Sequence, residues 1–428
     1  MTDAQTRPDD ANATESGEGA YAWMRLMVSL LLMTIGGVGM YSVTVVLPRI
    51  QSEFAVARGD ASLPYTLTMI GFGIGGLLMG KLSDRFGVMV PVLIGTVGLG
   101  AGFVAAGFAG NLWMFSLIQG VIIGLMGTSA TFSPLVADTS LWFTRKRGIA
   151  LAICMSGNYV AGAVWPPIIQ HFVEAVGWRQ TYIGIGVFCL VSMLPLAFVF
   201  RRRPPAQALA GTGTAAGSAS RLPPTVSDRP LGLSPATLQI LLCIAGVSCC
   251  VAMSMPQVHI VAYCGDLGFG AARGAEMLSL MLGMGVASRL LSGWISDHIG
   301  GLRTLLLGSA LQGVALLMFL PFDGLVPLYV VSGLFGLFQG GIVPSYALIV
   351  REYFTPKEAG ARVGAVLMAT LFGMALGGWM SGVIFDWTGS YKAAFVNGIA
   401  FNLLNLGIVL YLLWRARGIV RVAARKSV

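Results

Sequence analysis

GKLSDRFG at residues 80–87 recurs as GWISDHIG at residues 293–300, an offset of 213 positions. Four residues are identical in the two copies: Gly80, Ser83, Asp84 and Gly87 match Gly293, Ser296, Asp297 and Gly300. Two more pairs follow in the same order, WFTRKRGIA at 142 with YFTPKEAGA at 353, and GWRQTY at 177 with GSYKAAF at 389. Self-similarity of this kind indicates repeated structural units. The sequence therefore predicts two homologous halves in parallel orientation.

The chain of 428 residues is apolar: 56% of its residues are hydrophobic, the mean hydropathy is +0.79 and only 11% are charged. Ordinary soluble domains carry about 25% charged residues. Apolar runs of about 20 residues, the length that crosses roughly 30 Å of hydrocarbon, recur along nearly the whole chain. We predict an all-α integral membrane protein with twelve transmembrane helices in two pseudo-symmetric six-helix bundles. The expected spans are 24–47, 62–82, 88–108, 112–137, 148–171, 180–200, 236–262, 273–296, 304–321, 325–350, 363–385 and 391–414.

The segments between and beyond the spans divide the chain. Residues 1–20 are polar and acidic, which predicts a disordered cytoplasmic tail. Residues 201–235, which include AGTGTAAGSAS and RLPPTVSDRP, have the composition of a flexible linker. This linker separates an N-terminal bundle at 21–200 from a C-terminal bundle at 236–415, and residues 416–428 form a basic tail. Two such halves are the architecture of secondary transporters that rock around a midplane site.

The net charge of +9 follows a topological pattern. With the first loop after span 1 taken as external, only five of the 27 lysines and arginines fall in odd-numbered loops: Arg49, Arg58, Arg179, Arg273 and Lys392. All others except Arg289 lie at the N-terminus, in even-numbered loops or in the C-terminal tail, which is the positive-inside bias. We therefore expect a multi-pass protein of the cell (inner) membrane with both termini in the cytoplasm. The basic charge indicates orientation in a lipid bilayer and no nucleic-acid partner.

The repeated loop between spans 2 and 3 and between spans 8 and 9 resembles the loop motif of the major facilitator superfamily, Gly-x-Leu-x-Asp-Arg-x-Gly-Arg. The later basic residue of that pattern is replaced by Val88 and Met89. We expect Asp84 to cap or pair with a neighbouring helix end in one conformer and to be released in the other. The alternative is a solvated turn. The predicted gating set is Gly80, Asp84, Arg85, Gly87, Gly293, Asp297 and Gly300.

A second stretch, WFTRKRGIALAICMSGNYVAG at 142–162, resembles the span 4–5 signature of the monocarboxylate transporters and the related oxalate/formate antiporters. An aromatic–Phe pair, a basic pair and an Ala-rich helix carry the resemblance, with Pro134 eight residues upstream of the aromatic. From the residues alone, the basic triplet 145–147 is an interfacial anchor. The small residues after it allow close helix packing.

Arg289 stands in the apolar run GMGVASRLLSGWISDHIGG at 283–301, about eight residues, or near 12 Å of helix, from the end of span 8. A cation at that depth costs about 2.5 kcal/mol or more. The acidic residues all lie at predicted helix ends, in loops or in tails, so the simplest counter-ion is an anionic substrate. A guanidinium matches a carboxylate because two N–H groups meet two oxygens. The alternative is that Arg289 bonds helix carbonyls or hydroxyls across the bundle.

The monocarboxylate resemblance implies the same role, because a span-8 arginine binds the substrate carboxylate in that family. Two departures stand out. Mammalian members carry a proton-carrying aspartate four residues earlier, where this chain has Gly285, and oxalate exchangers carry a lysine in span 11, where this chain has no cation within 363–385. One central cation favours one carboxylate. His259 in span 7 is the candidate for proton coupling, since the unperturbed pKa of a histidine, about 6.5, suits a switch, and a structural histidine is the alternative.

The remaining pocket candidates are polar or aromatic mid-span residues on the helices that line the cavity in this superfamily, and each could equally serve helix packing. They are Tyr41, Ser133, Asn158, Tyr159, Phe335 and Gln339.

Together these features predict a secondary active transporter that works by alternating access with proton symport. Its predicted substrate is a small organic anion, and a monocarboxylate is the favoured class. The alternatives are an anion exchanger, a multidrug or metabolite exporter of the same fold, and a membrane sensor without flux. The sequence offers no nucleophile–base set, metal-ligand cluster or nucleotide loop. We therefore expect no enzyme activity, no cofactor and no metal, and a monomer whose partners are the substrate, a proton and the bilayer.

Overall fold

The computed structural model describes residues 19–143, 146–202 and 230–426, and within these residues twelve helical spans are long and apolar enough to cross a membrane. The N-terminal half contains α2 (Ala20–Gly36), α3 (Val38–Phe54), α4 (Arg58–Ala61), α5 (Leu63–Phe86), α6 (Met89–Gly107), α7 (Leu112–Leu117), η1 (Ile118–Thr128), α8 (Ser133–Trp142), α9 (Arg147–Val176), α10 (Trp178–Ala197) and η2 (Phe198–Arg201). The C-terminal half contains η4 (Pro230–Gly232), α12 (Pro235–Asp266), α13 (Ala271–Ile299), α14 (Gly301–Met318), α15 (Leu325–Gln339), α16 (Ile342–Tyr353), α17 (Pro356–Thr388) and α18 (Tyr391–Lys426).

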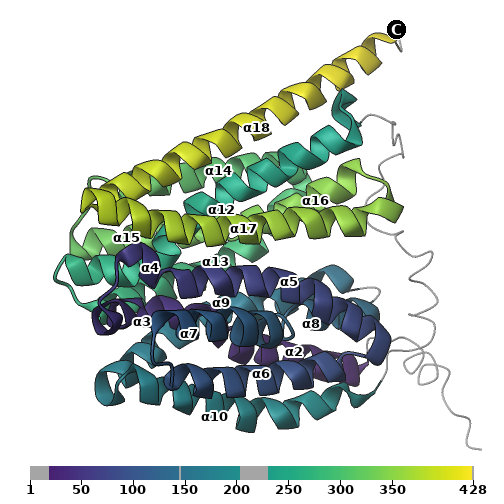
Figure 1. The fold of residues 1–428 in the computed structure, drawn as a ribbon. Helices are drawn as coiled ribbons and strands as arrows, with labels where there is room; N and C mark the ends of the chain where they lie inside the picture. The colour runs from purple at the N-terminus through teal and green to yellow at the C-terminus, as the bar shows by residue number, and fades with distance from the viewer. Residues whose placement is uncertain (1–18, 144–145, 203–229, 427–428) are drawn as a thin grey trace, which may run out of the picture.

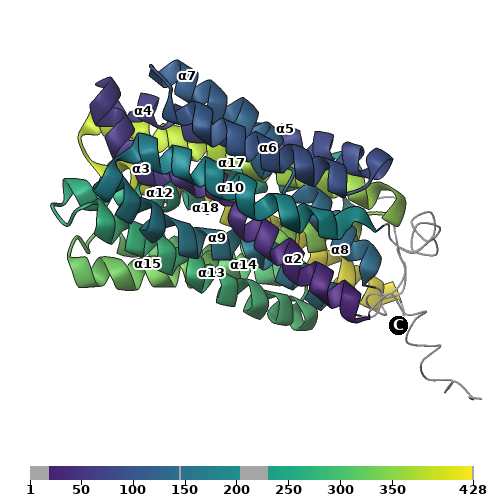
Figure 2. The ribbon, with the colours of Figure 1, turned by 90° about the horizontal axis from the view of Figure 1, so that it is seen from below.

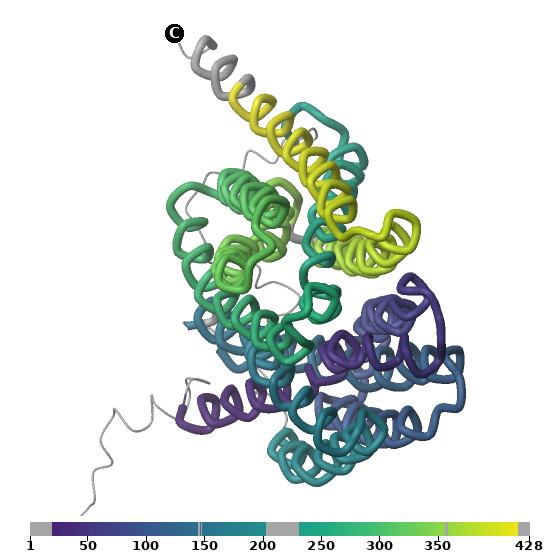
Figure 3. Tube along the Cα trace, turned by 90° about the vertical axis from the view of Figure 1, so that its left-hand side faces the viewer, coloured from purple at the N-terminus to yellow at the C-terminus, as the bar shows by residue number. Residues whose placement is uncertain are grey.

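The helices gather into two bundles that follow the order of the chain. The N-terminal bundle, purple to blue, forms one half of the molecule, and the C-terminal bundle, green to yellow, forms the other (Figures 1 and 3). The repeat is visible at the turns: Gly87 and Gly300 both have positive φ, 84° and 82°, and their N–H groups donate to Ser83 and Ser296 at 2.8 and 2.9 Å. The predicted fold, all-α with two pseudo-symmetric halves, is confirmed.

Several helices extend beyond the predicted spans. The first span begins at Ala20 and ends at Phe54, longer than the expected 24–47. Helix α18 continues without a break past residue 416, where the predicted basic tail begins, to Lys426. Most of the predicted N-terminal tail (1–18) and of the predicted linker (203–229) lies outside the described residues.

The molecule has two ends, which we name by their residues. The linker side is the end where α2 begins and α18 ends, and the Arg58 side is the opposite end, where α4 lies (Figures 1 and 2).

Three spans are interrupted near mid-depth. The first span breaks at Gly37 between α2 and α3, the fourth at residues 129–132 before α8, and the tenth at Gly340 and Gly341 between α15 and α16. The breaks in the fourth and tenth spans precede Pro134 and Pro344, and proline has no N–H to continue a helix. Because backbone that leaves a helix within a membrane is tolerated where it lines a cavity or is buried in protein, the breaks mark the region in which a site is expected.

The two bundles touch mainly through α5 with α17 and α9 with α13, and further contacts join α4 to α17 and α3 to α12. Toward the Arg58 side, glycines on α4, α5, α9, α13 and α17 are packed so closely that an added Cβ would meet atoms of the other bundle: Gly59, Gly73, Gly162, Gly285, Gly378 and Gly382. Toward the linker side, glycines of α5, α9, α13 and α17 have open space where a Cβ would lie: Gly80, Gly148, Gly293, Gly360 and Gly364. The bundles are therefore in contact on the Arg58 side and separated on the linker side.

Candidate functional site at the bundle interface

Arg289 lies on α13, half-buried, at the point where the bundle contact gives way to open space. Its Nη1 donates to the Met155 carbonyl of α9 at 3.1 Å, and its Nε donates to the Gly340 carbonyl at 3.5 Å. Its Cζ lies 4.3 Å from the centroid of the Tyr159 ring. No ion pair to a described acidic residue involves Arg289. The alternative that sequence reasoning left open, a bond to carbonyls across the bundle, is thus the contact seen in this structure.

Prolines explain why carbonyls are free to bond side chains here. The Gly340 carbonyl would bond the N–H four residues later in a continuous helix, but that residue is Pro344. The Ala163 carbonyl is freed in the same way by Pro167, and it accepts a hydrogen bond from Ser279 of the opposite bundle. Buried carbonyls need a donor, so each freed group is used to join elements around Arg289.

Two predicted pocket residues, Tyr41 and Tyr159, gather with Arg289. The Tyr159 ring faces the guanidinium and lies against Gly285, where an added Cβ would overlap the ring carbons. Tyr41 packs on Gly162 and has Tyr159 and Arg289 as its electrostatic neighbours. Two of the aromatic residues proposed for the pocket thus lie beside Arg289 in this structure.

The site has no counterpart in the other half. The position that the repeat relates to Arg289 is Gly76 on α5, where an added Cβ would lie 2.9 Å from Ser133 Oγ. Ser133 therefore faces α5 within its own bundle. The repeat thus has a cation at Arg289 in one half and a glycine at Gly76 in the other, a difference that helix packing alone does not require.

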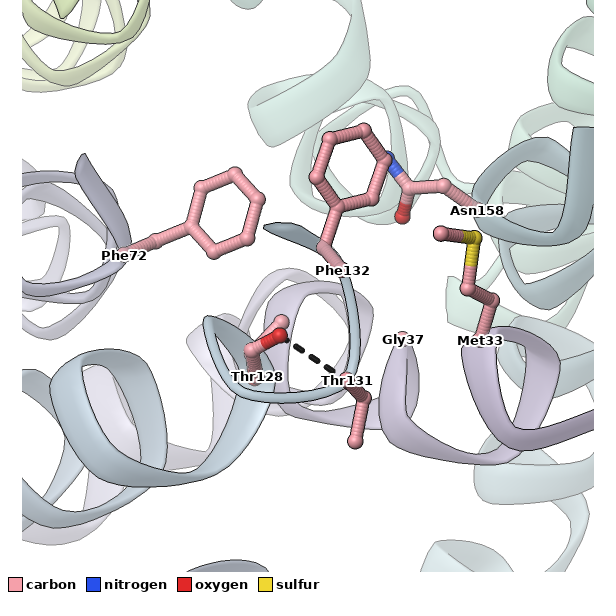
Figure 4. Close-up of a pocket in the computed structure, with 7 residues that line it drawn as sticks. All are labelled: Met33, Gly37, Phe72, Thr128, Thr131, Phe132 and Asn158. Atoms are coloured by element: carbon pink, nitrogen blue, oxygen red, sulfur yellow. Dashed lines mark hydrogen bonds between the residues drawn. The ribbon is translucent and has the colours of Figure 1, made fainter. Parts of the chain in front are cut away.

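A small hollow in the N-terminal bundle lies where the first and fourth spans are broken. It is lined by Met33, Gly37, Phe72, Thr128, Thr131, Phe132 and Asn158. Figure 4 shows the Asn158 amide beside the Phe132 ring, at the edge of this hollow. The structure thus brings one predicted pocket residue, Asn158, to the helix breaks.

Gln339 and Phe335, both on α15, have different surroundings. Gln339 is fully buried at the break before Gly340, and its Oε1 accepts from Gln257 Nε2 at 3.1 Å. Its Nε2 has no partner among the described residues. Phe335 packs on Phe319 of α14, with ring centroids 6.1 Å apart, in the core of the C-terminal bundle. Gln339 is therefore next in the chain to Gly340, whose carbonyl bonds Arg289, whereas the Phe335 ring packs on Phe319.

His259 of α12 is fully buried and lies among groups on the Arg58 side. Its Nε2 is 2.8 Å from the Gly378 carbonyl, which can only accept, so Nε2 carries a hydrogen. Its Nδ1 is 3.3 Å from Tyr391 Oη. Within the described residues no hydrogen bond or ring contact joins His259 to Arg289, so the structure does not bring the predicted proton carrier to the central cation.

Arg58 is the residue that sequence reasoning missed. Its Nη1 lies 2.7 Å from Asp266 Oδ2 and 2.5 Å from Tyr391 Oη, and its Nε lies 2.6 Å from Gln51 Oε1. The backbone N–H groups of Arg58 and Gly59 donate to the two Asp386 oxygens at 2.8 and 2.7 Å. Except for Gln51, all of these partners belong to the C-terminal bundle, so this cluster, which we call the Arg58 latch, joins the bundles.

A repeat-based signal for this latch existed. Asp266 is related by the repeat to Glu53, which accepts from Arg179 Nη2 at 2.7 Å within its own bundle. Lys392, the counterpart of Arg179, pairs instead with Asp323 at 3.0 Å, which leaves Asp266 for Arg58. The signal was Asp266 itself, an acidic residue whose expected partner, Lys392, pairs with Asp323.

The repeated loop residues are exposed in this structure. The Asp84, Arg85 and Asp297 side chains all lie on the linker side in contact with solvent, and no ion pair among the described residues includes them. Gly80 and Gly293 have open space at the Cβ position, whereas Gly87 and Gly300 make the turns. Gly87 and Gly300 thus have the positive φ of a turn, whereas Gly80 and Gly293 are not closely packed in this conformation.

A second buried pair stabilises the N-terminal bundle. Arg25 of α2 meets Asp138 of α8 through two bonds, Nε to Oδ2 at 2.6 Å and Nη2 to Oδ1 at 2.8 Å. The guanidinium also lies over the rings of Trp142 and Phe200 at 4.9 and 4.6 Å. Both side chains are almost completely buried, which makes the pair structural.

No group of three His, Cys, Asp or Glu side chains within the described residues could hold a metal ion.

The family model of the Major Facilitator Superfamily matches residues 29–327 and 287–424. The chain belongs to the Major Facilitator Superfamily. Among its relatives, monocarboxylate transporter 13 of Rattus norvegicus is 27% identical over 93% of this chain and 90% of that protein. Human monocarboxylate transporter 11 is 25% identical over 92% of this chain and 83% of that protein.

The fold of this superfamily member also matches solved structures. A bacterial homologue of the human lysosomal transporter Spinster, in an inward-facing and occupied conformation, aligns with a TM-score of 0.64 at 14% identity, over 95% of this chain and 97% of that one. At this identity the likeness concerns the fold. The superfamily and the curated relatives establish a multi-pass membrane transporter, similar to monocarboxylate transporters, that is not an enzyme.

Proposed function

We propose that this transporter carries a small organic anion, with a monocarboxylate as its substrate, and that Arg289 binds the carboxylate. The observation that supports this role is the position of Arg289: it lies at the bundle interface beside the break at Gly340, and no described acidic residue neutralises it. Among the described residues no hydrogen bond uses its Nη2, so the Nη1–Nη2 edge retains donors for a carboxylate. Asn158 and Gln339 are the polar side chains that we assign to the rest of the substrate, with Tyr41 and Ser133 at its edge.

We place the protein in the cell (inner) membrane with its linker side facing the cytoplasm, on the basis of the positive-inside bias. With that orientation, the contact at the Arg58 latch and the open space at Gly80 and Gly293 describe an inward-facing carrier. Alternating access then requires the latch to break while the linker side closes. Gly80 and Gly293 are the positions at which small size permits that closure, and Asp84 and Asp297 are the residues that we expect to bond the approaching helix ends.

Transport is coupled to a proton through His259 in this proposal. Tyr391 Oη accepts from Arg58 and therefore has its own hydrogen to donate to His259 Nδ1, so the bonds fit a neutral imidazole. The charged groups around His259 are Arg58, Asp266 and Asp386. When the latch opens, Arg58 leaves Tyr391 and the hydroxyl can accept from a protonated His259. Proton uptake then belongs to the outward-open state, and proton release to the latched state.

Liposomes containing the purified protein test this function. Uptake of labelled monocarboxylates is measured with an acidic exterior, and the neutral amide of the same acid serves as the control without a carboxylate. Uptake of the acid but not of the amide, driven by the pH step, supports the proposal. Transport of cationic drugs without any carboxylate favours the exporter alternative. Uptake that needs internal anion and ignores the pH step favours the anion exchanger, and binding without flux favours a sensor.

A further inference from the structure

The contacts of Arg289 in this structure raise the question of how a carrier without substrate neutralises its central cation. Both bundles contribute to the answer. Met155 and Tyr159 belong to α9 of the N-terminal bundle, whereas Arg289 and Gly340 belong to the C-terminal bundle. The guanidinium thus bridges the interface through groups that carry only partial negative charge: two carbonyl oxygens and the face of a ring.

We propose that Tyr159 and the Met155 carbonyl hold Arg289 in the substrate-free carrier in place of a carboxylate, so that the empty carrier can reorient and transport is net flux. This inference rests on the proposed function, in which Arg289 binds the substrate. A charged cation that had lost its anion and found no substitute would oppose reorientation of the empty carrier. Carbonyl dipoles and a ring face stabilise it, yet more weakly than an anion does. A carboxylate can therefore displace them.

This arrangement requires a glycine at one position, because a side chain there would abolish it. Gly285 stands one helical turn before Arg289, on the same face of α13. A Cβ at Gly285 would overlap the Tyr159 ring carbons, so only glycine lets the ring reach the guanidinium. The adjacent Gly340 is packed as tightly on α13, where an added Cβ would overlap the Gly285 carbonyl oxygen. Gly285 thus shapes the slot that Tyr159 occupies, and Gly340 brings the break in the tenth span against α13.

Three groups hold the guanidinium from three directions. The Gly340 carbonyl, freed by Pro344, accepts a hydrogen bond from Nε, and the Met155 carbonyl accepts one from Nη1. The Tyr159 ring covers one face of the guanidinium. The Gly340 contact lies within the C-terminal bundle and can persist when the bundles move. The Met155 and Tyr159 contacts lie at the interface where we place the substrate, so they are the ones that the substrate carboxylate replaces and that hold Arg289 in the empty carrier. Tyr159 is therefore a positioning residue that acts through Arg289.

The test compares two fluxes of the same labelled monocarboxylate in liposomes: efflux into substrate-free buffer, which needs the empty carrier to return, and exchange with saturating substrate on both sides, which does not. Tyr159→Leu removes the ring face while keeping an apolar side chain, and Tyr159→Phe keeps the ring as the matched control. We expect the ratio of net flux to exchange to fall about tenfold in Tyr159→Leu and to stay within twofold of the original in Tyr159→Phe.

A double variant gives a gain-of-function arm. Tyr159→Ala with Gly285→Asp empties the slot and puts a carboxylate one turn from Arg289, at a spacing that allows an ion pair. We expect this variant to recover the ratio lost in Tyr159→Leu. An unchanged ratio in Tyr159→Leu would overturn the inference, and so would a double variant with no higher ratio than Tyr159→Ala alone. Absence of any carboxylate transport by the unaltered protein would instead overturn the proposed function.

Discussion

Arg58 Nη1 lies 2.7 Å from Asp266 Oδ2, and the two residues belong to different bundles. The same guanidinium lies 4.5 Å from the Phe385 ring centroid and bonds Tyr391, so one side chain from the start of the second span contacts three helices of the opposite bundle. In the proposed cycle the linker side is open here, and we expect this latch to break when access switches.

The latch predicts a shift of conformation on substitution. Arg58→Ala should raise the ratio of molecules open on the Arg58 side to molecules closed there by roughly fivefold, because a partly exposed ion pair contributes about 1 kcal/mol. Distances between spin labels on the Arg58-side ends of the two bundles measure this ratio. The charge swap Arg58→Asp with Asp266→Arg is the control and should restore part of the closed population. An unchanged distance distribution in Arg58→Ala would remove the latch from the mechanism.

The repeated loop makes a prediction about rate. Asp84→Asn should leave substrate binding measurable and slow turnover, since Asp84 is assigned to the conformational equilibrium and not to the substrate. Asp297→Asn, the related change in the other half, should act in the same direction. Binding by calorimetry and turnover in liposomes separate the two effects. Loss of binding with normal turnover of bound substrate would show that the assignment to gating is wrong.

The coupling assignment makes a prediction about pH. His259→Gln should weaken the stimulation of uptake by external acid, because glutamine can donate to the Gly378 carbonyl but cannot carry the proton. Uptake is followed after a pH step at a fixed inward substrate gradient. Tyr391→Phe is the companion variant, since it removes the hydroxyl between Arg58 and His259. Acid stimulation that survives His259→Gln unchanged would leave symport in place and exclude His259 as its carrier.

The Arg25–Asp138 pair predicts an effect on stability. Arg25→Leu leaves the buried Asp138 carboxylate without its guanidinium, and breaking a buried pair costs about 3 to 5 kcal/mol. The melting temperature in detergent should fall clearly, and Arg25→Leu with Asp138→Leu should recover much of the loss, because no uncompensated charge remains. A double variant that melts lower than Arg25→Leu would contradict this account.

The sequence was sufficient for the fold because the information is local. Apolar segments have the length of a bilayer, and the copies at 80 and 293 appear as identical letters at a fixed offset. Arg289 could be found for the same reason, as one charge within an apolar run. Tyr41 and Tyr159 could be proposed because they stand mid-span on cavity helices, although nothing in their own surroundings in the sequence indicated the contact between Tyr159 and Gly285.

The latch could not be predicted, because its partners are distant in the chain. Arg58 reaches Asp266 across 208 positions and Tyr391 across 333, and in the sequence it is only one of five basic residues in odd-numbered loops. The helix breaks were also missed, although Pro344 was a usable signal, since it deprives Gly340 of its helical donor. Carbonyl partners for Arg289 follow from that break and not from any side chain.

The central claim is that Arg289 binds the substrate carboxylate, and uptake by three forms of the protein tests it most directly. Labelled monocarboxylate uptake is measured in liposomes with the original protein, Arg289→Lys and Arg289→Gln, each checked for folding by its melting profile. The account predicts a loss of at least about tenfold in Arg289→Lys, which keeps the charge but not the bidentate fork, and a greater loss in Arg289→Gln. Near-normal carboxylate uptake by a folded Arg289→Gln protein would contradict the claim.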